Sequence, residues 1–145
     1  MKTILSLTLV MVGALPACSS ESAESAAPSP VVGAWTQTTS EERFGAADWA
    51  VAKDAACRTD NTEEYAANGD FTLYDGTIRC GIGGTGISKG TWRLAAANTK
   101  LIFTYAGTSG DYVSTVESLT ATDMVLTFAT GETNGRQTRS TYRKR

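Results

Sequence analysis

The sequence predicts an all-β fold: a single eight-stranded antiparallel up-and-down barrel, with a two-sheet β-sandwich as the alternative. The first observation is that apolar residues recur at every second position, as in Phe71–Leu73, and not with the 3.6-residue period of a helix. The second is the frequency of turn signals such as Asn68–Gly69 and Asn134–Gly135, which favour tight hairpins. The third is that residues 31–145 contain no proline and are rich in Thr, Tyr, Val and Phe.

The same alternation places the strands along residues 31–145, which we expect to form one domain. Leu101 and Phe103, for example, alternate with Ile102 and Thr104. Strands are expected near residues 31–38, 60–67, 70–75, 87–95, 99–106, 112–119, 123–130 and 136–143. Every connection after the first is short, so strands that follow one another in the sequence should pair antiparallel. Closing such a meander into a barrel leaves no open edge strand.

Residues 1–17 are expected to form a signal peptide. Lys2 supplies a positive charge, and residues 4–15 form an apolar run that has the length of a signal core and is too short to span a bilayer. The segment Leu15-Pro16-Ala17-Cys18 resembles the bacterial lipobox, in which a Leu lies three residues before the Cys and a small residue lies directly before it. An ordinary secretory signal cleaved near Ala17 is the alternative.

The lipobox resemblance implies that Cys18 becomes the first mature residue and carries acyl chains such as palmitate. Several acyl chains together anchor a protein firmly in a membrane. The protein would then be lipid-anchored in the cell envelope, at the outer rather than the inner membrane, because Ser19–Ser20 lacks the Asp of inner-membrane retention. Residues 18–30 contain Ser, Ala, Glu and Pro with no large apolar side chain beyond Cys18, a composition typical of a disordered tether.

The cysteine count is consistent with this location. The chain has three cysteines, so lipidation of Cys18 would leave Cys57 and Cys80 as an even pair in an oxidising compartment. A disulfide between them should stabilise the domain by about 3 kcal/mol. We expect no metal site and no cofactor, because the chain has no histidine and no Cys-x-x-Cys motif.

A family resemblance lies in the tryptophan motifs. Gly33-Ala34-Trp35 matches the Gly-x-Trp signature at the start of lipocalins, whereas the second signature, a Thr-Asp-Tyr segment, is absent. The segment from Cys57 to Cys80 and the Gly90-Thr91-Trp92-Arg93-Leu94 motif that follows it resemble the lipocalin-like domains of bacterial lipoproteins. The resemblance implies a lipocalin-like barrel that binds a small apolar ligand in its mouth. Trp35 would plug the closed end, covered by an arginine of the last strand, for which Arg139 and Arg143 compete.

The tentative ligand-binding residues are Phe44, Trp49 and Trp92. Phe44 and Trp49 lie in residues 39–56, the long connection after the first strand, which by resemblance would lie over the open end of the barrel. All three side chains have an alternative role in packing against their own domain.

Catalysis is not expected. The chain has no histidine, so the usual acid–base shuttle is absent. The adjacent acids Glu63 and Glu64 would point to opposite faces of a strand and would not form a catalytic pair. The mature chain, without Lys2, would carry 12 basic and 15 acidic residues, so general nucleic-acid binding is not expected either.

Two non-enzymatic functions remain. The first is a monomeric binding module for a small apolar ligand, and the second is a protein-interaction module of the cell envelope, such as a scaffold or an inhibitor. The difference lies in whether large side chains fill the interior, because eight strands leave room for side chains or for one small ligand. The expected inward-facing residues are Trp35, Phe71, Leu73, Trp92, Leu101, Phe103, Met124, Leu126 and Phe128.

Overall fold

The computed structural model describes residues 29–79, 86–129 and 135–145. Its strands are β1 (Gly33–Phe44), β2 (Ala50–Val51), β3 (Thr62–Tyr65), β4 (Asp70–Tyr74), β5 (Ile87–Ala95), β6 (Lys100–Tyr105), β7 (Tyr112–Leu119), β8 (Asp123–Ala129) and β9 (Arg136–Lys144). One short helix, α1 (Ala55–Arg58), lies between β2 and β3. No helix in the described ranges has the length and hydropathy needed to cross a membrane.

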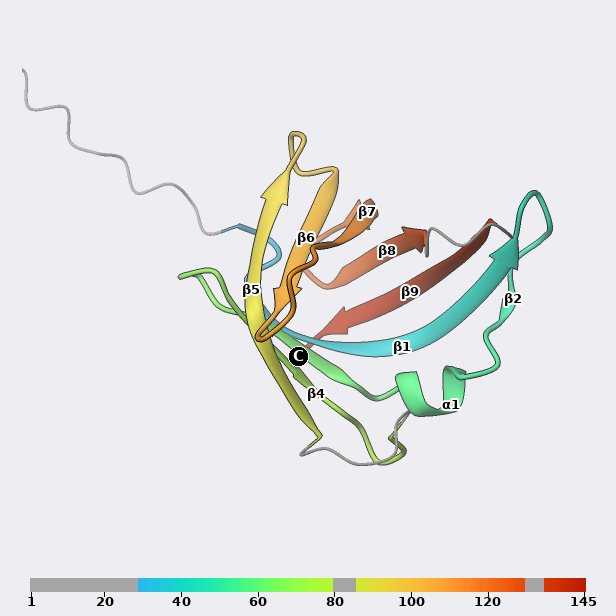
Figure 1. The fold of residues 1–145 in the computed structure, drawn as a ribbon, viewed down its shortest axis with the longest axis horizontal. Helices are drawn as coiled ribbons and strands as arrows, with labels where there is room; N and C mark the ends of the chain where they lie inside the picture. Colours follow the sequence, from blue (N-terminus) through green and yellow to red (C-terminus); the bar gives the residue numbers. More distant parts are fainter. Residues whose placement is uncertain (1–28, 80–85, 130–134) are drawn as a thin grey trace, which may run out of the picture.

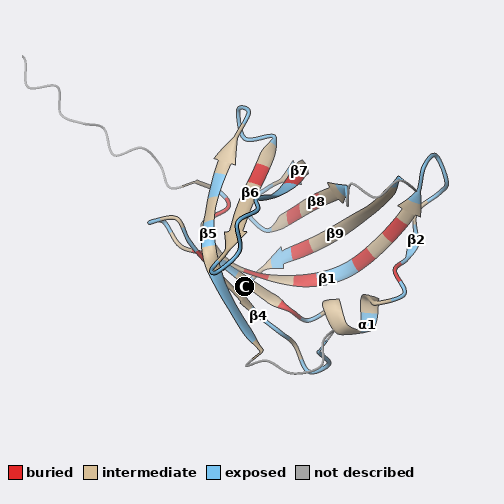
Figure 2. Cartoon of the chain, viewed as in Figure 1, coloured by how far each residue is buried: buried red, intermediate tan, exposed pale blue. Residues whose placement is uncertain are grey.

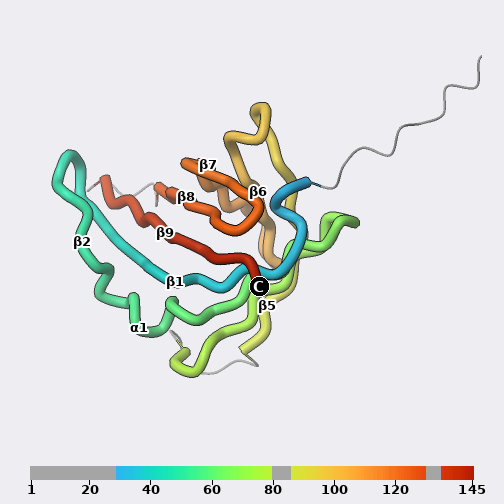
Figure 3. The backbone as a smooth tube through the Cα atoms, turned by 180° about the vertical axis from the view of Figure 1, so that it is seen from behind, coloured from blue at the N-terminus to red at the C-terminus, as the bar shows by residue number. Residues whose placement is uncertain are grey.

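The sheet closes into a barrel (Figure 1). Strands β1 and β3–β9 pair in sequence order, every pairing is antiparallel, and β9 pairs back onto β1. Figure 3 shows β9 and β1 side by side from the opposite direction. The predicted eight-stranded up-and-down barrel is therefore confirmed, and the two-sheet sandwich is excluded by the closing β1–β9 pair.

The first strand is longer than the sequence predicts. It was expected to end near residue 38, but it continues to Phe44, and its second half pairs with β9 from Thr39–Thr141 to Phe44–Arg136. A bulge between Gln37 and Thr39 shifts the alternation, so that buried positions 35 and 37 are followed by buried positions 40 and 42. The expected long connection over 39–56 is thus partly strand, with β2 added to the outer end of β1.

The hydrophobic core fills one half of the barrel, its closed end. The fully buried side chains are Trp35, Tyr65, Phe71, Leu101, Met124 and Val31. Figure 2 shows buried residues on several strands around the barrel. The indole N–H of Trp35 donates to the Val31 carbonyl at 2.7 Å, which ties the segment before β1 across this end. Trp35 therefore has the predicted core position.

The cation over Trp35 differs from the expected one. Lys144, the last residue of β9, places its Nζ 5.0 Å from the centre of the Trp35 ring. Arg139 and Arg143, the two expected candidates, form ion pairs with Glu41 and Asp123 instead. The reason is the strand register: Lys144 lies opposite Trp35, whereas Arg139 and Arg143 lie opposite Glu41 and Thr36.

Candidate functional site

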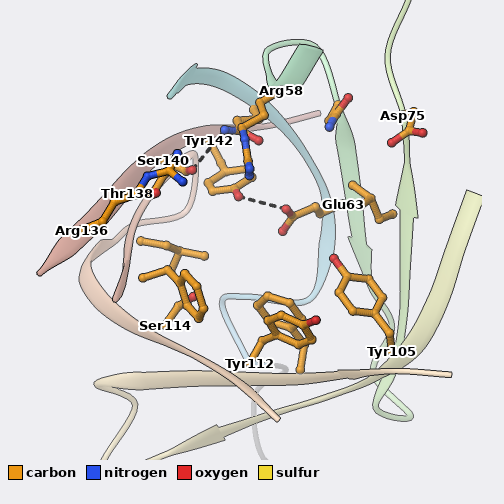
Figure 4. A pocket seen from close by; sticks show the side chains of 16 residues that line it. Arg58, Glu63, Asp75, Tyr105, Tyr112, Ser114, Arg136, Thr138, Ser140 and Tyr142 are labelled. Atoms are coloured by element: carbon orange, nitrogen blue, oxygen red, sulfur yellow. Dashed lines mark hydrogen bonds between the residues drawn. The ribbon is translucent and has the colours of Figure 1, made fainter. Parts of the chain in front are cut away.

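The open half of the barrel contains a cavity of about 350 Å³ (Figure 4). Its wall is formed by inward-facing side chains of strands β1, β3, β4 and β6–β9, and its mouth by residues at the ends of these strands and by α1. The lining residues are Gln37, Arg58, Asn61, Glu63, Leu73, Asp75, Phe103, Tyr105, Tyr112, Ser114, Leu126, Phe128, Arg136, Thr138, Ser140 and Tyr142.

One wall of the cavity is aromatic. The rings of Phe103 and Tyr112 stack with centroids 5.4 Å apart and planes within 5° of parallel. Tyr105 meets Tyr112 edge-on at 5.3 Å, and Phe128 continues the row from β8 at 6.1 Å from Tyr112. Because each ring is held by its neighbours, this wall is a preformed apolar surface.

The opposite wall is polar. Strand β9 presents Arg136, Thr138, Ser140 and Tyr142 to the cavity at alternate positions, as the two-residue period of a strand requires. The Ser140 hydroxyl accepts a hydrogen bond from the Gln37 side-chain amide at 3.0 Å. The cavity is therefore amphipathic, with hydroxyl and amide groups facing the aromatic rings.

Glu63 of β3, a half-buried residue, places its carboxyl group between these two walls (Figure 4). One of its oxygens accepts a hydrogen bond from the Tyr142 hydroxyl at 2.9 Å, and the other accepts one from the Tyr65 hydroxyl. Burial raises the pKa of Glu63, and the two tyrosine hydrogen bonds act in the opposite direction. In the described part of the chain, no lysine or arginine forms an ion pair with this carboxyl group.

The tyrosines around Glu63 are held in their neutral form. Burial raises the pKa of Tyr65 and of Tyr142, and the nearby Glu63 charge raises both further. Burial and the Glu63 charge also raise the pKa of Tyr105. These phenols therefore act as hydrogen-bond donors and not as bases.

The mouth carries charged groups from several elements. Arg58 of α1 points toward the cavity and forms an ion pair with Asp54 at 2.5 Å. Arg136 of β9 forms an ion pair with the mostly buried Glu42 of β1 at 3.0 Å. Asp75, directly after β4, adds a further carboxyl group to the lining. Both guanidinium groups at the mouth are thus already paired with acids.

None of the three residues predicted for ligand binding is among the lining residues of this cavity. Phe44 ends β1 and is 48% exposed. Trp49 lies between Arg43 and Arg139, whose Cζ atoms are 4.4 and 4.5 Å from its ring centre, on the outer face of the barrel. Trp92 packs edge-on against Tyr65 at the closed half and donates to the Ala66 carbonyl at 2.9 Å.

No residue of the expected connection over 39–56 is among the lining residues of the cavity. Arg58, at the end of α1 and two residues beyond that segment, reaches the cavity instead. The sequence reasoning missed Glu63 as well, although it placed Glu63 and Glu64 on opposite faces, which the structure confirms: Glu64 faces outward and accepts from Tyr74 at 3.2 Å. The sequence does contain one indication of the role of Glu63. It lies two residues before Tyr65, so in a strand it points to the same, inward face.

The cysteine predictions fall partly outside the described residues. Cys18 and Cys80 lie there, so lipidation and the Cys57–Cys80 disulfide stay predictions. Cys57 is in α1. The chain after β4 runs beside the end of this helix, because the backbone N–H of Gly76 donates to Asn61 at 2.7 Å and that of Thr77 to Asp60 at 3.2 Å.

Comparisons with known proteins do not assign the chain to a family. No protein-family model and no curated protein matches the chain. Among solved structures, the chain is similar to a bovine odorant binding protein, a deswapped triple mutant, with a TM-score of 0.48 and 16% identity over 81% of this chain and 75% of that one. The strand pairing itself carries the fold assignment. The described residues include no group of three or more acidic or cysteine side chains placed to hold a metal ion.

Proposed function

We propose that the protein is a non-enzymatic binding module of the cell envelope, anchored through lipidated Cys18, which takes a small and largely apolar molecule into its barrel. The observation that carries the proposal is the cavity in the open half. Its volume of about 350 Å³ falls at the lower end of the range of about 300–1,000 Å³ typical of small-molecule sites. The ligand is therefore small.

The inward-facing apolar residues support ligand binding over the protein-interaction module. Several of them, including Trp35, Leu101 and Met124, pack at the closed end. Leu73, Phe103, Leu126 and Phe128 instead line the cavity. The large side chains thus concentrate at one end and leave the other end hollow, as a binding barrel requires.

The position of the chain ends supports an accessible mouth. The described chain enters beside Trp35, and its last residue, Arg145, donates its N–H to the Ala34 carbonyl at 2.9 Å, so both ends lie at the closed end. A lipidated tether over residues 18–30 would span roughly 40 Å at most. It would hold the domain by its closed end and leave the mouth facing away from the point of attachment.

A cavity-filling substitution tests the proposal. Ser114 lies on the cavity wall and is buried, whereas Ser118 on the same strand is exposed. Ser114→Phe should abolish binding of small aromatic molecules, measured by amide chemical-shift changes on titration of isotope-labelled protein, and the matched control Ser118→Phe should not. Equal binding by wild type and Ser114→Phe, or binding by neither wild type nor Ser118→Phe, would contradict a cavity ligand.

A further inference from the structure

We propose that the ligand is an organic cation: an amine with an aromatic or similarly compact apolar body, whose ammonium group pairs with Glu63. The inference rests on the proposed function and adds the chemical class of the ligand. Its basis is the placement of the half-buried Glu63 carboxyl group, which has no ion-pair partner among the described residues, between the aromatic wall and the polar wall of the cavity.

The Glu63 carboxyl group has no ion-pair partner among the described residues. A carboxylate that is partly withdrawn from water is stabilised when it is paired with a cation and hydrogen-bonded. The hydroxyl groups of Tyr65 and Tyr142 give one hydrogen bond to each oxygen, and each oxygen has a second lone pair. An ammonium group offers donors as well as a positive charge, so it supplies both missing interactions.

The aromatic wall of the cavity also favours a positively charged ligand. The faces of tyrosine and phenylalanine rings attract cations, and the attraction increases when water is excluded. Tyr105 lies close enough to Glu63 for the carboxylate charge to raise its pKa. A cation bound at Glu63 would therefore lie near an aromatic ring on one side, while its apolar body packs against Phe103, Tyr112 and Phe128.

The charged groups around the cavity disfavour an anionic ligand. Arg58 and Arg136 line the cavity, but each is paired with an acid, Asp54 and Glu42. An anionic ligand would have to compete for these guanidinium groups and would bring a negative charge toward Glu63. Among the described residues, the lining carries the carboxyl groups of Glu63 and Asp75, and its two guanidinium groups are each paired with a further acid, so the local charge balance favours a cation.

The experiment compares three probes of nearly equal shape on the purified full-length protein: phenethylamine, n-propylbenzene and phenylacetate. Calorimetry should show that phenethylamine binds most tightly. Glu63→Gln should weaken phenethylamine binding about 10–100-fold, the effect of losing a hydrogen-bonded charge pair. Binding of n-propylbenzene should stay within about twofold, which also shows that the variant is folded. The matched control Asp75→Asn removes a mouth carboxyl group and should have a smaller effect on phenethylamine.

Proton linkage gives an independent measurement. The groups that face Glu63 are Tyr65, Tyr142 and Tyr105, with the charged groups of Arg58, Arg136 and Asp75 at the mouth. Since a cation prefers the ionised carboxylate, phenethylamine affinity should fall as the pH is lowered through the raised pKa of Glu63, and this dependence should disappear in Glu63→Gln.

The possible failures are distinguishable. If n-propylbenzene binds but phenethylamine binds no more tightly, or if Glu63→Gln leaves phenethylamine affinity and its pH dependence unchanged, the cation assignment is wrong and the binding function stands. Tighter binding of phenylacetate would also overturn the assignment. If none of the three probes binds, the proposed function itself fails.

Discussion

Replacing Trp35 tests the division of the barrel into a packed end and a hollow end. Trp35 is fully buried, its indole N–H donates to the Val31 carbonyl, and the Lys144 ammonium group lies over its ring. In Trp35→Phe the buried Val31 carbonyl loses its donor, which costs about 1–3 kcal/mol. A weaker cation contact adds about 0.5–1 kcal/mol, and the smaller ring leaves a void. The free energy of unfolding should therefore fall by about 2–4 kcal/mol.

The assay is urea unfolding followed by circular dichroism. With an m value of about 2 kcal/mol per M, in the middle of the usual range for small proteins, the midpoint should move by about 1–2 M. The other two tryptophans are matched controls. Trp92→Phe, at a half-buried ring that donates to Ala66, should cost about 1 kcal/mol. Trp49→Phe, at a half-buried ring between two arginines, should cost about 0.5–1 kcal/mol. If Trp35→Phe costs no more than Trp49→Phe, the core is not at the closed end.

Three further predictions concern the leader, the disulfide and the pH dependence of stability. The wild-type protein should incorporate a palmitate analogue and fractionate with membranes. The Cys18→Ala variant should be released in soluble form or remain unprocessed. A wild-type protein that is unlabelled and found in the soluble periplasmic fraction would contradict lipidation. Non-reducing mass spectrometry should find Cys57 linked to Cys80, and removing the link should cost about 2–5 kcal/mol, whereas two alkylatable thiols in the oxidised protein reject it. Burial raises the pKa of Glu63 above its ordinary value of 4.5, so the stability that this group contributes is fully present below pH 4.5 and is lost as the pH rises through the raised pKa. The unfolding free energy of the wild type should therefore decline relative to that of Glu63→Gln over this interval. Parallel curves for the two proteins would show that the Glu63 carboxyl group is not withdrawn from water in the folded protein.

Most of the barrel could be predicted because several strands have one face that is mainly apolar. In β4, β6 and β8 the apolar residues alternate with polar ones, so the pattern locates both the strands and their inward faces. The second half of β1 has no such pattern. Its residues Ser40 to Arg43 pair with β9, which is equally polar. The ion pairs Glu41–Arg139 and Glu42–Arg136 join the two strands, and they cannot be inferred until the pairing of β1 with β9 is known.

The cavity could not be predicted for a similar reason. Glu63, Tyr142 and Tyr105 are distant in sequence, and each is unremarkable in its own strand. Alternation shows that Glu63 shares a face with Tyr65, but not that this face is buried beside β9. Phe44 and Trp49 are predicted ligand contacts because they lie in a long connection. In the structure, β1 pairs with β2 in this segment, and Trp49 lies between two arginines on the outer face of the barrel.

The most direct test of the account is a crystal structure of the protein with para-bromophenethylamine, in which the anomalous signal of bromine locates the ligand. The account predicts bromine density inside the open half of the barrel, beside Phe103 and Tyr112, with the amine nitrogen within hydrogen-bond distance of the Glu63 carboxylate. Bromine density on the outer face, or a ligand in the cavity with its amine directed away from Glu63, would contradict it.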